Sequence, residues 1–253
     1  MSSTNTASDE LRESLAEYYQ SGGNISVTES AKSLLTKVSE DLRYELLSSI
    51  TQIGGDTALA LAAFRGHTEL CVTLLSSLPP ADRLELILVH KYTALHRAAR
   101  WGYTETVSCI LNCLTAGQQL QLLFSQDIFG DTALHEAAQG GNTETVRALL
   151  ENLTHEQQLQ LLFTQDIVGN TALHLAAHQG HTETVRSLLH NLRPEQQLYL
   201  LSVENYVGKT ASQFAANNKQ KEIVEMLKDM SGIWILELII VSCKTSMYLI
   251  TTS

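Results

Sequence analysis

The chain of 253 residues contains only three prolines and has 17 basic residues against 27 acidic ones. Three prolines, at Pro79, Pro80 and Pro194, are too few for a proline-rich linker. The net charge of −10 argues against unselective binding to nucleic acids or anionic membranes, because neutralising phosphates requires a basic face. We therefore expect neither a nucleic acid nor a membrane as partner.

Cysteine is also scarce, with Cys71, Cys109, Cys113 and Cys243 as its four occurrences. Zinc would need two further ligands near Cys109 and Cys113, and the sequence has no CxxC pair. This pattern favours free thiols in a reducing compartment over a metal site. The polar N-terminal residues 1–10 lack the apolar core of a secretory signal, so we expect a cytoplasmic protein.

Short catalytic motifs are missing as well. The sequence contains no GxSxG, P-loop, HExxH or GxGxxG motif, which are the common signatures of hydrolases, nucleotide-binding proteins, metalloproteases and dinucleotide-binding enzymes. The sequence therefore predicts neither an enzyme nor a cofactor site.

What the chain does contain is a repeated motif. Thr-Ala-Leu-His occurs at 93–96, 132–135 and 171–174, in steps of 39 residues (132 − 93 and 171 − 132). Each occurrence is followed by Ala-Ala, a glycine and a T-E-x-V segment, and degenerate copies begin at Thr57 and Thr210. A fixed period of this size indicates stacked repeats rather than a globule with one central site.

Residues 127–153 predict the structure of one repeat. Asp127 to Gly130 is typical of a turn, and the apolar spacing that follows indicates two short helices separated by Gly140-Gly141. A T-x-x-Q capping box then precedes further leucines in two copies, and Pro80 and Pro194 suit a first helical turn. These signals predict a third short helix in each repeat, with its glutamine pairs at 118–119, 157–158 and 196–197 exposed to solvent.

Residues 166–189 carry a resemblance to a known family. They read DIVGNTALHLAAHQGHTETVRSLL, which resembles the ankyrin repeat apart from Ala172 in the usual proline position. The resemblance implies an all-α ankyrin-repeat solenoid of stacked helix pairs with short β-hairpin or loop fingers. The period of 39 exceeds the family's roughly 33 residues, which leaves room for the extra helix. It also implies that the motif histidines, His96, His135 and His174, tie adjacent loops together by backbone hydrogen bonds.

The repeat pattern suggests three regions. Residues 1–35 are expected to form a helical N-terminal cap derived from a degenerate repeat, and residues 36–230 to form five ankyrin repeats, of which the second has a blunted finger. Residues 231–253 form a hydrophobic tail with three possible origins: a segment packed on the last repeat, a membrane anchor, or a translated non-coding stretch. Glu237 and Lys244 argue against the anchor because of the cost of charge in a bilayer.

The resemblance implies a non-catalytic scaffold or adaptor that binds a protein partner on its concave surface, and we expect a monomer. A regulatory or targeting fragment of a larger enzyme or membrane-tethered protein is the alternative. Arginines and aromatic residues are frequent binding hot spots, and an excess of arginine in an acidic chain suggests an acidic partner segment. Trp101 is not required by the repeat core; the competing interpretation is that it packs over the blunted finger. The predicted partner-binding residues are Phe64, Arg65, Tyr92, Arg97, Arg100, Trp101, Tyr103, Phe129, Glu136 and Gln139.

Overall fold

The computed structural model describes residues 33–48, 57–89, 92–190 and 192–230, together with residues 10, 13, 14, 17 and 232. Over these residues the regular elements are helices, and the β-structure is a single bridge between Glu204 and Thr210. The predicted all-α class is therefore confirmed. The helices include α3 (Glu40–Ser48), α4 (Ala58–Phe64), α5 (Thr68–Ser76), α6 (Pro80–Leu88), α7 (Ala94–Arg100), α8 (Thr104–Asn112), α9 (Ala116–Leu123), α10 (Ala133–Gly140), α11 (Thr143–Glu151), α12 (His155–Leu162), α13 (Ala172–Gln179), α14 (Thr182–Leu189), α15 (Pro194–Ser202) and α16 (Ala211–Asn217). Residues 33–37 and 221–230 are helical as well.

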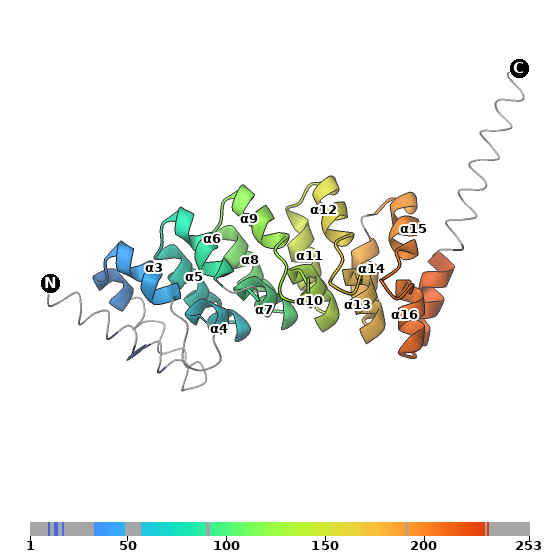
Figure 1. Ribbon diagram of the computed structural model, residues 1–253, viewed down its shortest axis with the longest axis horizontal. Helices are drawn as coiled ribbons and strands as arrows, with labels where there is room; N and C mark the ends of the chain where they lie inside the picture. The colour runs from blue at the N-terminus through green and yellow to red at the C-terminus, as the bar shows by residue number, and fades with distance from the viewer. Residues whose placement is uncertain are drawn as a thin grey trace, which may run out of the picture. The chain divides into compact units, whose positions relative to one another are not determined.

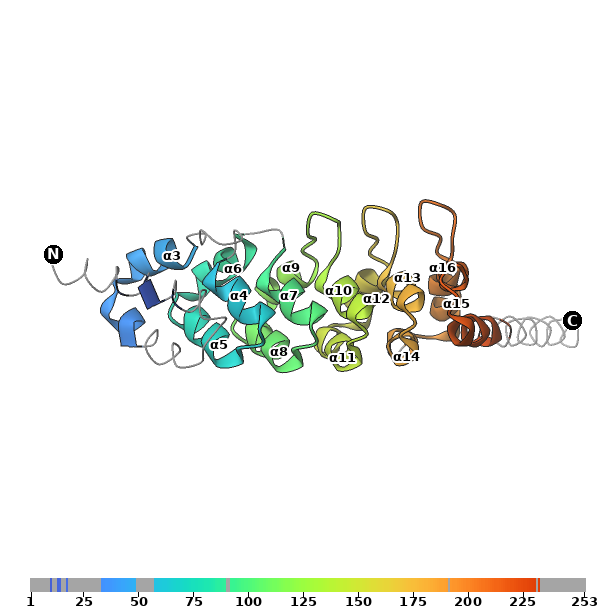
Figure 2. The ribbon, with the colours of Figure 1, turned by 90° about the horizontal axis from the view of Figure 1, so that it is seen from below.

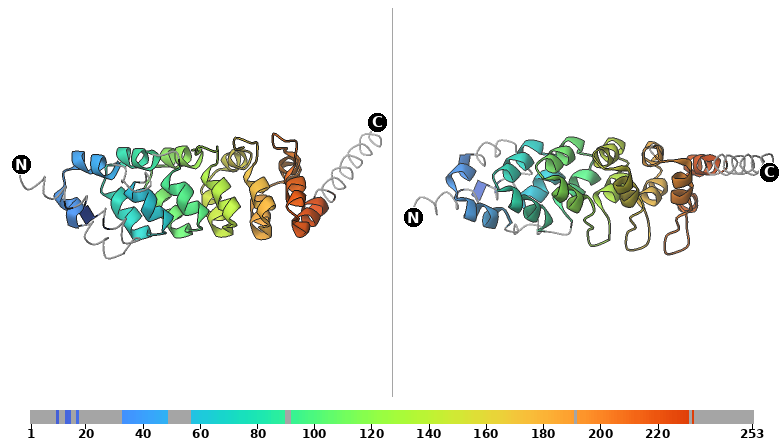
Figure 3. Two further views of the ribbon diagram at one scale, coloured as in Figure 1. Left: turned by 60° about the horizontal axis from the view of Figure 1, so that its bottom comes forward. Right: turned by 90° about the horizontal axis from the view of Figure 1, so that it is seen from above.

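The chain divides into two compact units, Met1–Thr154 and His155–Ser253. In the first unit, α4, α7 and α10 pack side by side as the first helices of successive repeats (Figure 1). The second helices α5, α8 and α11 form a neighbouring row, and α3, α6 and α9 form another (Figure 3). In the second unit, α13 packs against both α14 and α16. Helix pairs thus repeat within each unit, as the sequence period predicts.

The alanine pairs of the motif form the core between the first helices. Ala98 and Ala99 on α7, and Ala137 and Ala138 on α10, are completely buried. Because a methyl group is the whole side chain, neighbouring helices can approach closely at these positions. Leu134 is buried beside them, so each repeat completes its core against the next one.

Threonine hydroxyls join the second helices of the first unit. The side chain of Thr68 on α5 hydrogen-bonds that of Thr106 on α8, with 2.7 Å between the oxygens. Thr104 on α8 makes the same bond, also 2.7 Å long, with Thr145 on α11. Threonines in the first turns of the second helices therefore link successive repeats.

The third helix predicted from the long period follows the helix pair of each of the first four repeats, as α6, α9, α12 and α15. Pro80 and Pro194 occupy the first turns of α6 and α15, where a missing backbone N–H costs nothing. Thr115 and Gln118 form the predicted capping box of α9: the Thr115 N–H donates to Gln118 Oε1 at 3.0 Å, and the Gln118 N–H donates to Thr115 Oγ1 at 3.4 Å.

The prediction that the glutamine pairs are solvent-exposed is wrong for Gln197, which is buried, and the other five members are half-buried. Gln197 is only 7% exposed, and its Nε2 donates to the carbonyls of Leu189 at 2.9 Å and Leu192 at 3.0 Å. Gln119 donates likewise to Leu111 at 2.9 Å and to Leu114 at 3.3 Å. The reason is that the last carbonyls of a helix have no partner within it. A glutamine at this position supplies the donors that the ends of α8 and α14 need.

The motif histidines hold the loop fingers that extend away from the helices (Figure 2). His96 is buried, and its Nε2 lies 2.9 Å from the carbonyl oxygen of Asp131 in the next finger. His174 makes the matching contact with the carbonyl oxygen of Lys209 at 3.0 Å. The structural role implied for these two histidines is confirmed.

Several expectations fall on residues outside the described part of the chain. They concern most of the predicted cap at 1–35, residues 90–91 of the blunted second finger, and all but one residue of the tail at 231–253. Within the described residues, no helix combines the length and apolar character that crossing a membrane requires.

Candidate partner-binding surface

The C-terminal end of α7 concentrates the predicted site residues. Arg97 and Arg100 lie in its last turn, and Trp101 is its C-cap residue. Cations are favoured there, because the unpaired carbonyls at a helix C-terminus carry partial negative charge. Since α7 packs between α4 and α10, these side chains are placed beside residues from both neighbours.

An aromatic pocket lies between the ends of α4 and α7. We use this name for a surface pocket of about 400 Å³ lined by Phe64, Arg65, His67, Trp101 and Tyr103. The Phe64 and Trp101 rings pack edge to face with centroids 5.5 Å apart, yet they remain 37% and 56% exposed. The Tyr103 ring lies against the Gly66 backbone, where an added Cβ would come within 2.5 Å of the ring. The walls of the pocket are therefore aromatic rings in contact with each other or with the backbone.

An arginine strip leads from this pocket towards α10. It consists of Tyr92, Arg97 and Arg100. The Arg97 guanidinium carbon lies 6.0 Å from the ring centroid of Phe64 and 5.0 Å from that of Tyr92, within cation–π range of both rings. Arg100 pairs with the Glu136 carboxylate at 3.4 Å. Pocket and strip thus form one continuous surface across α4, α7 and α10.

Glu136 is a buried carboxylate that contacts two residues of the strip. It is only 6% exposed, and it pairs with Arg100 and hydrogen-bonds the side chain of Tyr92. Burial raises the pKa of Glu136, and the Arg100 charge acts in the opposite direction. Burial, followed by the Glu136 charge, likewise raises the pKa of Tyr92. Glu136 therefore orients two strip residues while showing little of itself to solvent.

Glu136 also belongs to a cluster of three carboxylates with Asp127 and Asp131, whose oxygens lie within 4.8 Å of one another. Such oxygens are the donors that hard divalent cations use. Here Asp127 Oδ1 already accepts the N–H groups of Phe129 at 2.7 Å and Asp131 at 2.9 Å, and Glu136 is paired with Arg100. The Arg100 guanidinium also opposes a second cation beside it. We assign the cluster to shaping the finger and the arginine strip.

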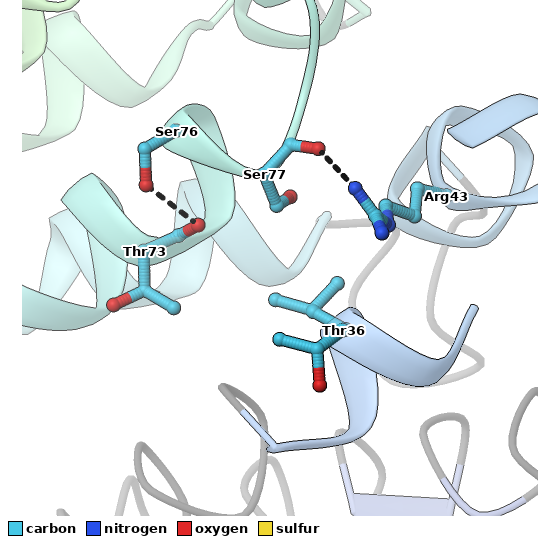
Figure 4. A pocket seen from close by; sticks show the side chains of 6 residues that line it. Thr36, Arg43, Thr73, Ser76 and Ser77 are labelled. Carbon is cyan, nitrogen blue, oxygen red and sulfur yellow. Dashed lines mark hydrogen bonds between the residues drawn. The ribbon is translucent and has the colours of Figure 1, made fainter. Parts of the chain in front are cut away.

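A second pocket, of about 230 Å³, lies between residues 33–48 and the end of α5 (Figure 4). Arg43 crosses it, donating from Nη1 to the Ser77 carbonyl at 3.0 Å and from Nε to the Val38 carbonyl at 2.9 Å. The first bond satisfies the carbonyl of the C-cap residue of α5, and the second satisfies a carbonyl that precedes α3. The pocket's charged group therefore joins two segments of the first unit.

A comparison with protein families identifies the repeats that carry this surface. A family model described as "Ankyrin repeats (3 copies)" matches residues 26–122, 110–198 and 159–236. The chain belongs to the ankyrin repeat family. Ankyrin repeats typically mediate protein–protein interactions and are typically non-catalytic, and the match identifies no catalytic domain. A search of curated proteins produced no match.

The ankyrin fold brings together every predicted site residue except one. Phe64, Arg65, Trp101 and Tyr103 line the aromatic pocket, and the remaining residues belong to the arginine strip or contact it, Gln139 through a hydrogen bond from Arg100. The exception is Phe129, which is 58% exposed at a fingertip.

Two exposed features, one in each unit, were missing from the prediction. His67 lines the aromatic pocket, and burial lowers its pKa, an effect that the Arg65 charge reinforces. Tyr206 and Val207 form an exposed fingertip pair in the second unit, 71% and 72% exposed. Their position 39 residues after Ile167-Val168 (206 − 167) is the sequence signal that could have identified them.

Proposed function

We propose that this ankyrin-repeat protein is a non-catalytic scaffold that binds an acidic segment of a protein partner. The binding surface consists of the aromatic pocket and the arginine strip on α4, α7 and α10. The observation that carries the proposal is the clustering of exposed aromatic rings with arginines in a chain whose net charge is −10. Aromatic and arginine side chains are the residues that contribute most to binding energy at interfaces.

The chemistry of the described side chains supports a binding role over a catalytic one. Buried His96 and His174 are engaged in finger contacts, and burial lowers the pKa of both. Burial raises the pKa of the Cys71 thiol to about 12, which makes it a poor nucleophile. Thiols of this kind suit the reducing cytoplasm, which we propose as the location.

The test is a double substitution, Arg97→Ala with Trp101→Ala, in the full chain. The wild-type protein is used to capture partners, and the affinity of each partner is then measured for the variant. We expect affinity to fall by at least about tenfold, because both side chains belong to hot-spot classes. The melting temperature should stay near that of the wild type, since Trp101 and Arg97 lie outside the helix core.

A matched control is Arg186→Ala with Tyr199→Ala, which removes an exposed arginine and an exposed aromatic side chain from the second unit. This control should bind as the wild type does. Equal affinity of the two double variants for every captured partner would exclude the α4–α7–α10 surface as the binding site.

A further inference from the structure

The aromatic pocket has the size of a site for one side chain. Its volume of about 400 Å³ lies near the lower end of the roughly 300–1,000 Å³ range of small-ligand sites. A helix or strand of a partner could cover such a pocket, and a single large side chain could enter it. Three of its five lining residues, Phe64, Trp101 and Tyr103, are aromatic.

The walls favour an aromatic guest. Aromatic rings attract one another in edge-to-face or offset arrangements, and Phe64 and Trp101 already adopt the edge-to-face arrangement with each other. Arg65 lines the same pocket, and a guanidinium over a ring face adds cation–π attraction. A guest ring would therefore meet partners of both kinds, whereas an aliphatic guest would gain only burial.

The rim favours carboxylates on either side of that guest. Arg65 and His67 line the pocket, and Arg97 lies over the edge formed by Phe64. Among the described residues, Glu136 is an acidic side chain in contact with the strip, and it is buried and paired with Arg100. Arg65 and Arg97 thus supply positive charge at the described part of this rim.

We propose that the aromatic pocket receives one aromatic side chain of the partner's acidic segment, with neighbouring carboxylates of that segment beside Arg65 and Arg97. This inference rests on the proposed function and adds an anchor residue to it. Single-stranded nucleic acid also combines rings with negative charge. The net charge of −10 disfavours that partner, because phosphate binding needs a broad basic surface.

The inference can be tested with a library of random short peptides displayed on phage and selected on the immobilised full chain. The selected peptides should share an aromatic residue with acidic residues close on either side. A synthetic copy of the strongest-binding peptide should bind the Trp101→Ala variant at least about tenfold more weakly than the wild type. Replacing the aromatic residue of the peptide with alanine should weaken binding to the wild type by a similar factor. The Tyr206→Ala variant, which removes an exposed ring from a fingertip, should bind it normally.

A second readout reports on the pocket directly. The chain has two tryptophans, so a Trp234→Phe variant leaves Trp101 as the only one. Its fluorescence should change when the selected peptide binds and should not change with the alanine-substituted peptide. Circular dichroism of each variant confirms that it is folded.

The outcomes separate the two proposals. Selected peptides that lack the aromatic–acidic pattern, or that bind the Trp101→Ala variant unchanged, would overturn the anchor and leave the scaffold function intact. If an equal concentration of single-stranded oligonucleotide displaced the peptide, the ligand of the pocket would be a nucleic acid, and the proposed acidic protein segment would be wrong. Failure to select any peptide would count against the anchor, and failure to capture any protein as well would count against the scaffold.

Discussion

Replacing His174 with alanine tests how the fingers of the ankyrin repeats are held. The imidazole is fully buried between its own repeat and the next finger. Its Nδ1 accepts the Thr171 N–H at 3.2 Å, so the proton of the neutral ring lies on Nε2, which donates to the Lys209 carbonyl at 3.0 Å. One side chain therefore satisfies two backbone groups that are 38 residues apart (209 − 171).

The expected loss follows from those two groups. A buried backbone group that loses its partner costs about 1–3 kcal/mol. The Thr171 N–H is buried, whereas the Lys209 carbonyl is partly buried and can regain some hydration. Removing the ring also takes away its contact with Phe214, whose centroid lies 6.3 Å from it. We expect His174→Ala to lower the free energy of unfolding by about 2–3 kcal/mol.

The measurement is urea denaturation followed by circular dichroism, with His155→Ala as the matched control. His155 is exposed on α12, and its described hydrogen bond is to the side chain of Gln196 at the surface, so its loss should change the free energy by no more than about 0.5 kcal/mol. If the two variants were equally stable, the finger contact would contribute nothing and the structural interpretation of the motif histidine would be refuted.

Two further predictions concern the buried motif histidines and the glycines. Burial lowers the pKa of His96 and of His174 in the folded state, so below pH about 6.5 the unfolded chain binds protons that the folded chain does not. As the pH falls, the free energy of unfolding should decrease by up to about 1.4 kcal/mol per pH unit for each histidine. In denaturation series between neutral and acidic pH, the His174→Ala variant should show a shallower slope than the wild type. Gly169→Ala should lower the melting temperature, because Gly169 has φ +84° and an added Cβ would lie 2.6 Å from the Tyr206 backbone. Gly117→Ala should raise the melting temperature, because Gly117 lies on α9 and an added Cβ would have nothing within 4 Å. A change of the same sign in both variants would contradict this account.

The repeat fold could be predicted from the sequence because its signals recur. The motif fixes the register of the first helix and its alanine core, and the excess length over the usual ankyrin period, with Pro80 and Pro194, indicates the third helix. Each of these signals concerns local geometry or apolar spacing, which a sequence displays directly.

Hydrogen bonds between side chains and distant carbonyls are less visible in a sequence. Gln119 and Gln197 each follow another glutamine and lie on amphipathic helices, so polarity alone suggests that they face solvent. Their burial depends on the open carbonyls at the ends of α8 and α14, which come into reach only when the third helix folds back. The Thr104–Thr145 bond depends in the same way on the packing of two repeats.

For the candidate surface, too, some features could be predicted from the sequence and others depend on the packing of the fold. The sequence shows which positions vary within the fixed repeat register, and all of the candidate residues except Phe129 lie in the pocket, in the strip or in contact with the strip. That a partner binds there stays a prediction. The burial of Glu136 could not be predicted, since it depends on Tyr92 and Arg100 both reaching over it. Burying a carboxylate is unfavourable unless it is paired, so Glu136 holds the strip in place only while Arg100 stays with it. In this surface Arg100 therefore stabilises the strip, whereas Arg97 and Trp101 are the side chains through which we expect the partner to bind.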